Sequence, residues 1–308
     1  MRKEIIEGLT AASPRVSPKF LYDPLGSRLF EAITALPEYY PTRTEKAILA
    51  ECIGQIVPLT GTGCTFIELG AGNCEKAHPL FSVLRPAQYV AIDLSVEFLE
   101  RALGRLRSLY PDLDILGLGM DFSRALRLPA TVRRGKRLFF YPGSSIGNFT
   151  PEEALGLLST IRKQCARDGH LLVGVDLVKD IGALVSAYDD PLGVTAAFNV
   201  NILNHLNALI GSDFNLGDWQ HRALFNENES RIEMHLEARR DAVVSWRDGG
   251  RHFPAGARIH TENSYKYELA HFNRLLVQAG FGAIRSWTDD KAWFGMFLAS
   301  SRVHMAMR

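Results

Sequence analysis

The chain has 308 residues, which corresponds to about two domains of ordinary size. Hydrophobic residues make up 46% of it and charged residues 22%, a composition that excludes disordered and fibrous classes. The formal net charge is only +1, so no overall field favours nucleic acid or an anionic membrane, and we expect neither as a partner.

Alternating strands and helices are predicted for the first two thirds of the chain. Short apolar runs predict strands at 64–69, 89–92, 113–118, 138–141 and 170–176. One helix is expected after Ser95, and another begins after Thr150, where Pro151 and two acidic residues follow a threonine N-cap. We expect the second helix to run to about Arg167. Five strands joined by helical crossovers imply an α/β fold with a parallel, doubly wound sheet.

The pattern changes after about residue 194. A helix over 198–210 is followed by alternating segments at 231–238 and 243–246, which predict antiparallel strands. Two apolar runs at 283–287 and 293–299 predict a hairpin that completes the main sheet. We therefore expect two domains: a Rossmann-like core made of 60–195 and 281–308, and a second α+β domain made of 1–59 and 196–280. A cleft between two such lobes is the default place for a substrate.

Targeting and metal signals are missing from the sequence. The first fifteen residues mix charges early and contain no apolar core of a secretory signal, and no apolar stretch approaches the ~20 residues that span a bilayer. The four cysteines show neither a CxxC pair nor the spacing of zinc ligands. We expect a cytoplasmic monomer with reduced thiols and no metal.

The first predicted strand ends in a glycine turn, Glu68 to Gly72. Glycines allow the backbone to approach a ligand closely. The third glycine of a dinucleotide fingerprint is replaced by Glu75, whose carboxylate would oppose a pyrophosphate. S-adenosylmethionine (SAM), which carries no phosphate, fits better than NAD. Asp93 after the second strand and Asp121-Phe122 after the third suit a nucleoside, although both acids can also cap the helices that follow.

The loop after the fourth strand runs from Tyr141 to Phe149. It lacks the Asn/Asp-Pro-Pro-aromatic tetrad usual in nucleic-acid amino-methyltransferases, which argues against a flipped base as substrate. Its glycines and Asn148 suit a small polar ligand, and a plain turn is the alternative.

The chain resembles the SAM-dependent histidine Nα-methyltransferases of ergothioneine biosynthesis. The resemblance extends from about residue 18 to the C-terminus. The strings that carry it are 36–45, 68–72 with 75–76, 143–149, 176–180, 187–190 with 193–199, 231–234, and 261–262 with Ser264.

The resemblance implies a class I SAM methyltransferase fold and a role for each matched residue. SAM would be held by Gly70, Lys76, Asp93, Asp121 and Phe122. L-Histidine would be bound by Tyr39, Gly143, Asn148, Tyr188, Met234, Glu262 and Ser264. Among these, Asn148 and Tyr188 would grip the carboxylate and Tyr39 would lie near the amine. Met234 would pack beside the imidazole, and Glu262 and Ser264 would take its two nitrogens.

The chemistry of imidazole agrees with this assignment. A neutral imidazole has one donor and one acceptor nitrogen, so it needs an acceptor and a donor opposite it. Glu262 and Ser264 are two apart and share a face if their segment is a strand. Asn263, polar where the family usually has an apolar residue, would then face away. Asn73-Cys74 is a second departure, in the glycine loop, and bears on how the methionine part of SAM is held.

The implied reaction is transfer of three methyl groups to the α-nitrogen of histidine, giving hercynine. The amine must lose a proton, either to the proposed catalytic residue Tyr39 through a water or directly to solvent. The nearest alternative is an enzyme of the same fold that methylates another aromatic amino acid such as tryptophan. A nicotinamide-dependent oxidoreductase and a non-catalytic SAM-binding module are more distant alternatives.

Overall fold

The computed structural model describes residues 1–165 and 168–302. The chain divides into two compact units: unit 1 is Met1–Tyr40 with Lys179–Tyr265, and unit 2 is Pro41–Val178 with Lys266–Arg308. The predicted helix end near Arg167 and the last six residues of the predicted core lie outside the described residues.

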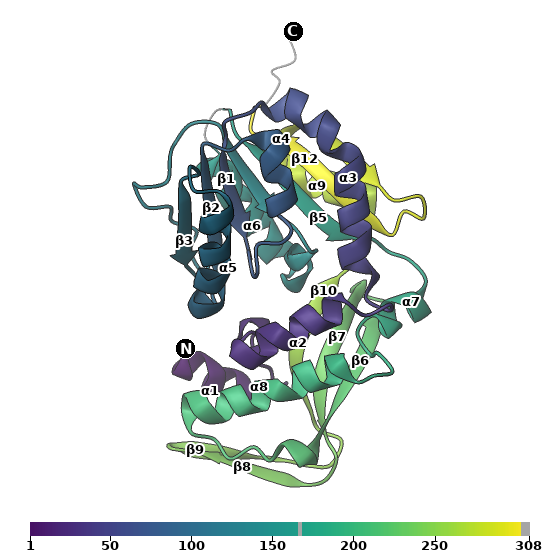
Figure 1. The fold of residues 1–308 in the computed structure, drawn as a ribbon. Coiled ribbons are helices and arrows are strands. Elements are labelled where there is room, and N and C mark those ends of the chain that lie inside the picture. The colour runs from purple at the N-terminus through teal and green to yellow at the C-terminus, as the bar shows by residue number, and fades with distance from the viewer. Residues whose placement is uncertain (166–167, 303–308) are drawn as a thin grey trace. The chain divides into compact units, whose positions relative to one another are not determined.

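Unit 2 contains a seven-stranded sheet in the order β11-β12-β5-β4-β1-β2-β3 (Figure 1). Its strands are β1 (Thr65–Leu69), β2 (Gln88–Asp93), β3 (Ile115–Gly119), β4 (Arg137–Tyr141), β5 (His170–Asp176), β11 (Gly282–Thr288) and β12 (Phe294–Ser300). The first five are parallel, and β12 runs antiparallel to both β5 and β11. The five predicted strands and the hairpin that completes the sheet are confirmed, with ends shifted by one or two residues.

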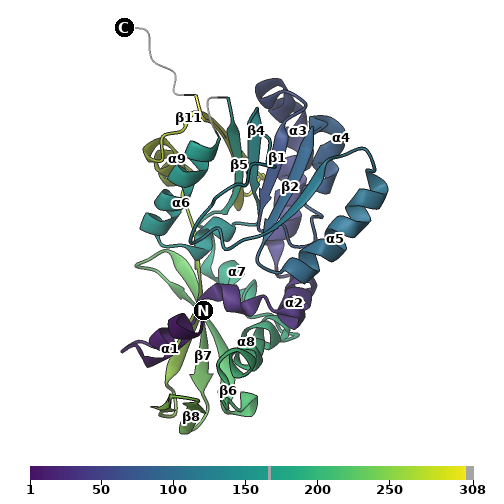
Figure 2. The ribbon, with the colours of Figure 1, turned by 90° about the vertical axis from the view of Figure 1, so that its left-hand side faces the viewer.

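Helices cover both faces of this sheet. They are α3 (Tyr40–Thr60), α4 (Phe81–Leu84), α5 (Val96–Leu109), α6 (Pro151–Gln164) and α9 (Leu269–Gln278), with 3-10 turns η2 (His78–Leu80) and η3 (Ser145–Asn148). Figure 2 shows α3, α4 and α5 on one face and α6 and α9 on the other. The prediction that helices make every crossover is wrong for the connection from β3 to β4, since residues 120–136 contain no helix. That segment holds Pro129 and Gly135 and is ordered by short turns such as the one in which Arg124 N–H donates to Asp121 O.

The two helix starts differ in how they are capped. At α6 the Glu153 N–H donates to Thr150 Oγ1 and the Thr150 N–H donates to Glu153 Oε2, which confirms the predicted N-terminus as a capping box. Ser95 occupies the predicted N-cap of α5, but its side chain makes no cap bond. Its backbone N–H instead donates to Asp93 Oδ1 at 2.9 Å.

Unit 1 is built on the antiparallel sheet β10-β7-β6, with a separate hairpin β8-β9. Its strands are β6 (Trp219–Asn226), β7 (Arg231–Ala238), β8 (Ala242–Trp246), β9 (Gly249–Phe253) and β10 (Arg258–Tyr265). Its helical elements are α1 (Arg2–Thr10), η1 (Pro18–Leu21), α2 (Pro24–Thr34), α7 (Ile181–Ser186), α8 (Val194–Ile210) and η4 (Leu216–Asp218). Helix α8 packs against β6 and β7, and α2 packs on α8 (Figure 1). The predicted α8, β7 and β8 are confirmed, whereas β6 and β9 were not predicted.

The boundaries between the units lie earlier in the chain than those expected from the sequence. Helix α3 belongs to unit 2 because Ile48, Cys52 and Ile56 pack in the same buried cluster as Phe66 of β1. Helix α9 likewise packs on α6 and β11 of unit 2. Burial of these two amphipathic helices, rather than a change in sequence pattern, decides where each unit begins.

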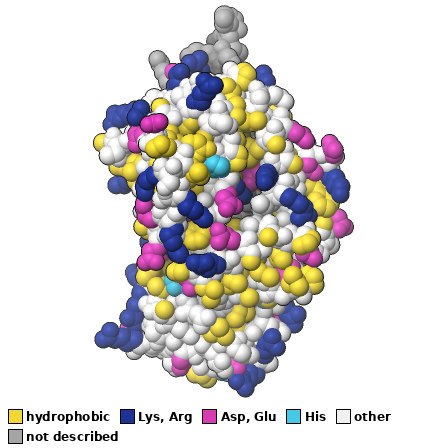
Figure 3. Space-filling view, in the orientation of Figure 1, with side chains coloured by type: hydrophobic (Ala, Val, Ile, Leu, Met, Phe, Trp, Pro, Cys, Tyr) yellow, Lys and Arg dark blue, Asp and Glu magenta, His cyan; other side chains and the backbone are white. Residues whose placement is uncertain are grey.

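The surface of the protein carries charges of both signs. Basic and acidic side chains are both spread over the face shown in Figure 3. Within residues 1–165 and 168–302, every helix is too short or too polar to cross a bilayer. All four cysteines are buried and free, and the same residues contain no group of three or more His, Cys, Asp or Glu that could hold a metal.

Candidate functional site

The loop after β1 presents an open backbone. Gly70 and Gly72 both have positive φ, 69° and 52°, which favours glycine at each position. The N–H groups of Gly70 and Ala71 donate to Ile92 O, and the Gly72 N–H donates to Asp93 Oδ2 at 2.8 Å. A Cβ at either glycine would meet no atom within 4 Å. The loop is therefore fastened to the end of β2 on one side and open on the other.

Asp93 both organises this loop and remains available to a ligand. Its two oxygens accept the N–H groups of Gly72 and Ser95, so the expected capping role is real. A carboxylate oxygen has a second acceptor position, and Asp93 is only half-buried. Capping and ribose binding are thus compatible at this residue.

The residues after β3 also place an acid, Asp121, at the carboxyl end of a strand. Asp121 is half-buried and forms an ion pair with Arg124 at 3.6 Å. The Phe122 ring meets the Tyr141 ring edge-on, with centroids 5.8 Å apart. An acid and an aromatic ring therefore lie at the carboxyl end of the strand next to Asp93.

Glu68, at the end of β1, faces the interior of unit 2. It is fully buried and accepts a hydrogen bond from the Tyr89 hydroxyl. Burial raises the pKa of Glu68 to about 8, so the group beneath the glycine loop is largely uncharged at neutral pH. Asp93 and Asp121 are therefore the acids of this sheet edge that we consider for nucleoside binding.

Glu45 of α3 connects two loops and was not singled out by the sequence. Its side chain is 1% exposed, and Oε2 pairs with Lys76 Nζ at 2.8 Å. Its other oxygen accepts the Gly143 N–H at 2.7 Å. One buried carboxylate thus fixes a cation of the glycine loop and the start of the loop after β4.

Gly143 and Asn148 lie in that second loop of unit 2. Gly143 has φ 77°, and a Cβ there would come within 2.8 Å of Lys76 Nζ, so the position favours glycine. Asn148 ends η3 and is half-buried. The Asp176 N–H donates to Ser144 Oγ at 2.8 Å, which ties the loop to the end of β5.

The residues at this sheet edge fit SAM. An open glycine backbone, two half-buried carboxylates and an aromatic ring suit a ribose, an adenine and a cationic methionine chain. They offer no cluster of cations for a pyrophosphate. The chemistry of these groups therefore suits a nucleoside that carries no phosphate.

The other predicted residues come together in unit 1. Ser264 of β10 bonds the Tyr188 hydroxyl at 2.7 Å, and the Tyr188 ring lies 6.2 Å from the Tyr39 ring. Glu262 is the cross-strand partner of Met234, and all five side chains are buried. Glu262 and Ser264 are 7% and 3% exposed, so a ligand there would meet polar groups largely withdrawn from water.

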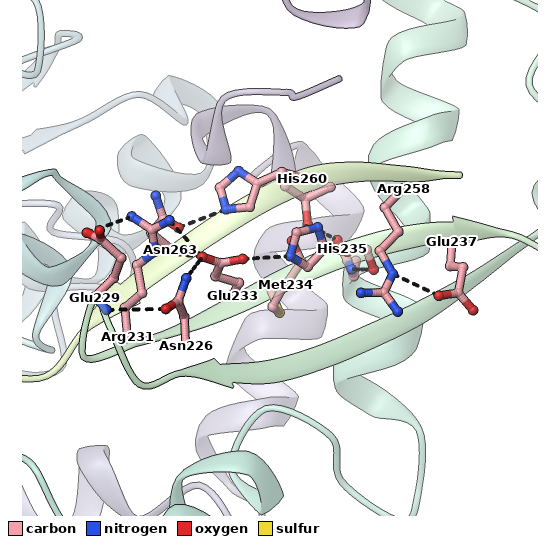
Figure 4. Close-up of polar contacts among 12 residues, drawn as sticks. Asn226, Glu229, Arg231, Glu233, Met234, His235, Glu237, Arg258, His260 and Asn263 are labelled. Atoms are coloured by element: carbon pink, nitrogen blue, oxygen red, sulfur yellow. Dashed lines mark hydrogen bonds and ion pairs between the residues drawn. The ribbon is translucent and has the colours of Figure 1, made fainter. Parts of the chain in front are cut away.

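Asn263 lies on the opposite face of this sheet, as strand alternation predicts. It pairs with Glu233 across the strands, and its Oδ1 lies 2.8 Å from His260 Nε2 (Figure 4). The departure from the family pattern at this position therefore adds no polar group to the Glu262 face.

Fold and site together define a class I SAM-dependent methyltransferase. A crystal structure of an S-adenosylmethionine-dependent methyltransferase from Clostridium acetobutylicum matches 90% of this chain and 99% of its own, with a TM-score of 0.54 and 12% identity, which supports the fold.

Sequence relatives narrow the class further. A histidine N-alpha-methyltransferase from Mycolicibacterium smegmatis is 40% identical over 97% of this chain and 94% of its own length. One of the same description from Mycobacterium tuberculosis is 37% identical over the same shares. The family model described as histidine-specific methyltransferase, SAM-dependent, matches residues 1–301. The chain belongs to the family of histidine-specific, SAM-dependent methyltransferases, which confirms the predicted fold class, enzyme class and cofactor.

Proposed function

We propose that the chain methylates the α-nitrogen of L-histidine three times with SAM and releases hercynine, as in ergothioneine biosynthesis. The observation that carries the proposal is that Glu262 and Ser264 lie on one buried strand face of a member of this family. Met234 is the cross-strand partner of Glu262, and Tyr188 bonds Ser264. The face offers an acceptor, a hydroxyl and an apolar wall, which are the groups a neutral imidazole requires.

SAM, when bound, supplies a methyl group on a sulfonium that is already activated for transfer. The chain's task is therefore alignment, which brings the reacting atoms to roughly 3–3.5 Å. The resemblance described above implies that SAM is held by Gly70, Lys76, Asp93, Asp121 and Phe122. The openness of the glycine loop and the half-burial of both acids support this assignment.

The hydroxyl pair of Tyr188 and Ser264 bears on how the ring would be held. When Tyr188 donates its proton to Ser264, the serine proton is left for the acceptor nitrogen of the imidazole, and Glu262 accepts from the other. When Ser264 instead donates to Tyr188, the tyrosine proton is left for the substrate carboxylate, the role given to Tyr188 by the resemblance. Asn148 is the second group proposed for the carboxylate.

The α-amine must be neutral at each attack, so one proton leaves the nitrogen before each of the three transfers. Tyr39 is the proposed catalytic residue and acts through a water, and loss to solvent is the other route. Its ring is buried against Phe30 and Tyr188, which would hold the hydroxyl in a fixed direction.

The experiment is incubation of the purified chain with SAM and L-histidine, followed by mass spectrometry. The proposal predicts histidine carrying one, two and then three methyl groups, with the trimethylated product accumulating. L-Tryptophan in a parallel reaction tests the alternative acceptor. Preferential methylation of tryptophan, or no methylation of histidine, would overturn the proposal.

A further inference from the structure

We propose that Thr261 is a positioning residue for histidine specificity: it forms a β-bulge that turns Glu262 and Ser264 onto the Met234 face of the sheet. The inference rests on the proposed function, since it explains how the ring-binding pair is aimed. Thr261 is a fully buried polar residue, 0% exposed.

The bulge is seen in the pairing of β10 with β7. His260 lies opposite His235, but Glu262 lies opposite Met234, so two steps along β10 match one step along β7. Thr261 is the extra residue. Figure 4 shows the two faces that result: the His235, His260 and Glu233 side chains lie on one side of the strands and Met234 points to the other.

Without the bulge, strand alternation would place Glu262 on the same face as His260. It would then point toward the cluster of Glu233, Arg231 and His235, where the carboxylate of Glu233 is already bound by both of the others. The one extra residue thus decides whether the ring-binding pair faces Tyr188 or faces a packed network of ions. Because every residue after the bulge follows the shifted register, Ser264 moves with Glu262.

The Thr261 hydroxyl fastens the bulge from the inside. It lies 2.7 Å from Asn199 Oδ1 and 3.0 Å from Met234 O, and both are acceptors for its proton. Asn199, on α8, is itself 0% exposed. Its Nδ2 donates to His235 O at 3.0 Å, and because a carbonyl only accepts, this bond fixes which way the amide points. The bulge and the strand opposite it are therefore held by one side chain.

The same network reaches Tyr188. Asn199 Nδ2 lies 2.9 Å from His221 Nδ1, which must then be an acceptor, so His221 carries its proton on Nε2 and donates it to Tyr188 O at 2.8 Å. Burial lowers the pKa of His221, in keeping with a neutral ring. Thr261, Asn199 and His221 thus connect the register of Glu262 to the backbone of the residue that bonds Ser264.

Three substitutions at one position test the proposal. Thr261→Val keeps the shape and removes the hydroxyl, Thr261→Ser keeps the hydroxyl, and Thr261→Cys keeps the size with a weak donor. The KM for histidine should rise about ten- to hundredfold in Thr261→Val, less in Thr261→Cys, and less than threefold in Thr261→Ser. The kcat at saturating histidine should change far less than KM, and the Kd for SAM by calorimetry should stay within twofold.

A matched control separates positioning from loss of stability. Thr65→Val removes an equally buried threonine hydroxyl in β1, one that donates to Gly135 O at 3.3 Å. It should lower Tm and leave the KM for histidine unchanged. If Thr261→Val does not fold, the Ser and Cys variants still test the ranking by donor strength.

An unchanged KM in Thr261→Val, or a Thr261→Ser variant as impaired as Thr261→Val, would overturn the inference. Both outcomes are read against a wild-type chain that methylates histidine. Failure of the wild type would instead overturn the proposed function.

Discussion

Removal of the Glu262 carboxylate should weaken the binding of histidine rather than the chemistry. Glu262 and Ser264 are 7% and 3% exposed, so the proposed bond to the ring forms where water competes little. A hydrogen bond to a charged group contributes about 1.5–3 kcal/mol, which at tenfold per ~1.4 kcal/mol corresponds to roughly a ten- to 150-fold loss of kcat/KM. We expect the ring, which takes no part in the methyl transfer, to be bound equally in the ground and transition states, so the loss in Glu262→Ala should appear in KM.

The assay is initial methylation rate against histidine concentration at saturating SAM. Glu262→Gln retains an acceptor oxygen without the charge and should fall between wild type and Glu262→Ala. Discrimination against tryptophan should shrink in Glu262→Ala, because the variant no longer offers the carboxylate that pairs with the imidazole of histidine.

Glu233→Gln is the control for this experiment. Glu233 is a carboxylate of similar burial on the opposite face of the same sheet, where it bonds Asn226, Arg231 and His235. Its substitution should lower the stability of the chain and leave the KM for histidine unchanged. Histidine kinetics of Glu262→Ala that match the wild type would refute the assignment of Glu262 to the ring.

Three further predictions concern the affinity for SAM, the stability of a buried ion pair and the pH dependence of Tm. Asp93→Ala should weaken SAM binding at least tenfold by calorimetry, since it removes the acceptor of the Gly72 N–H and the proposed ribose ligand; unaltered affinity would exclude Asp93. Asp176→Asn should cost about 3–5 kcal/mol in urea unfolding, because Lys266, 0% exposed and 2.8 Å from Asp176, keeps a buried charge; a cost below about 1 kcal/mol would contradict this. Burial lowers the pKa of three histidines of unit 1, so these side chains bind more protons in the unfolded chain than in the folded one below about pH 6.5. Tm should therefore fall steadily from about pH 6.5 toward pH 5. A Tm that stays flat or rises over this range would contradict the prediction. These histidines are His221, His235 and His260.

The centre of the main sheet could be predicted because its strands are buried on both faces. Continuous apolar runs such as 138–141 and 170–176 can be read locally, and the capping box at Thr150 is a local signal as well. Strand β6 was missed because its residues, Trp219 to Asn226, are mostly half-buried and mix apolar with polar side chains without strict alternation.

The candidate site was predicted by type of residue rather than by geometry. Glu262 and Ser264 share a face, as expected, because the bulge lies before both residues and not between them. The bulge itself depends on how β10 pairs with β7, which a single strand does not encode. Glu45 was missed for a similar reason: a glutamate on a helix is usually exposed, and its burial depends on the two loops that pack over it.

The most direct test of the histidine assignment is a crystal structure of the chain with S-adenosylhomocysteine and L-histidine. The account predicts Glu262 and Ser264 within about 2.7–3.2 Å of the two imidazole nitrogens, with the α-nitrogen directed at the sulfur. An imidazole bound elsewhere, with Glu262 and Ser264 in contact with neither nitrogen, would contradict it.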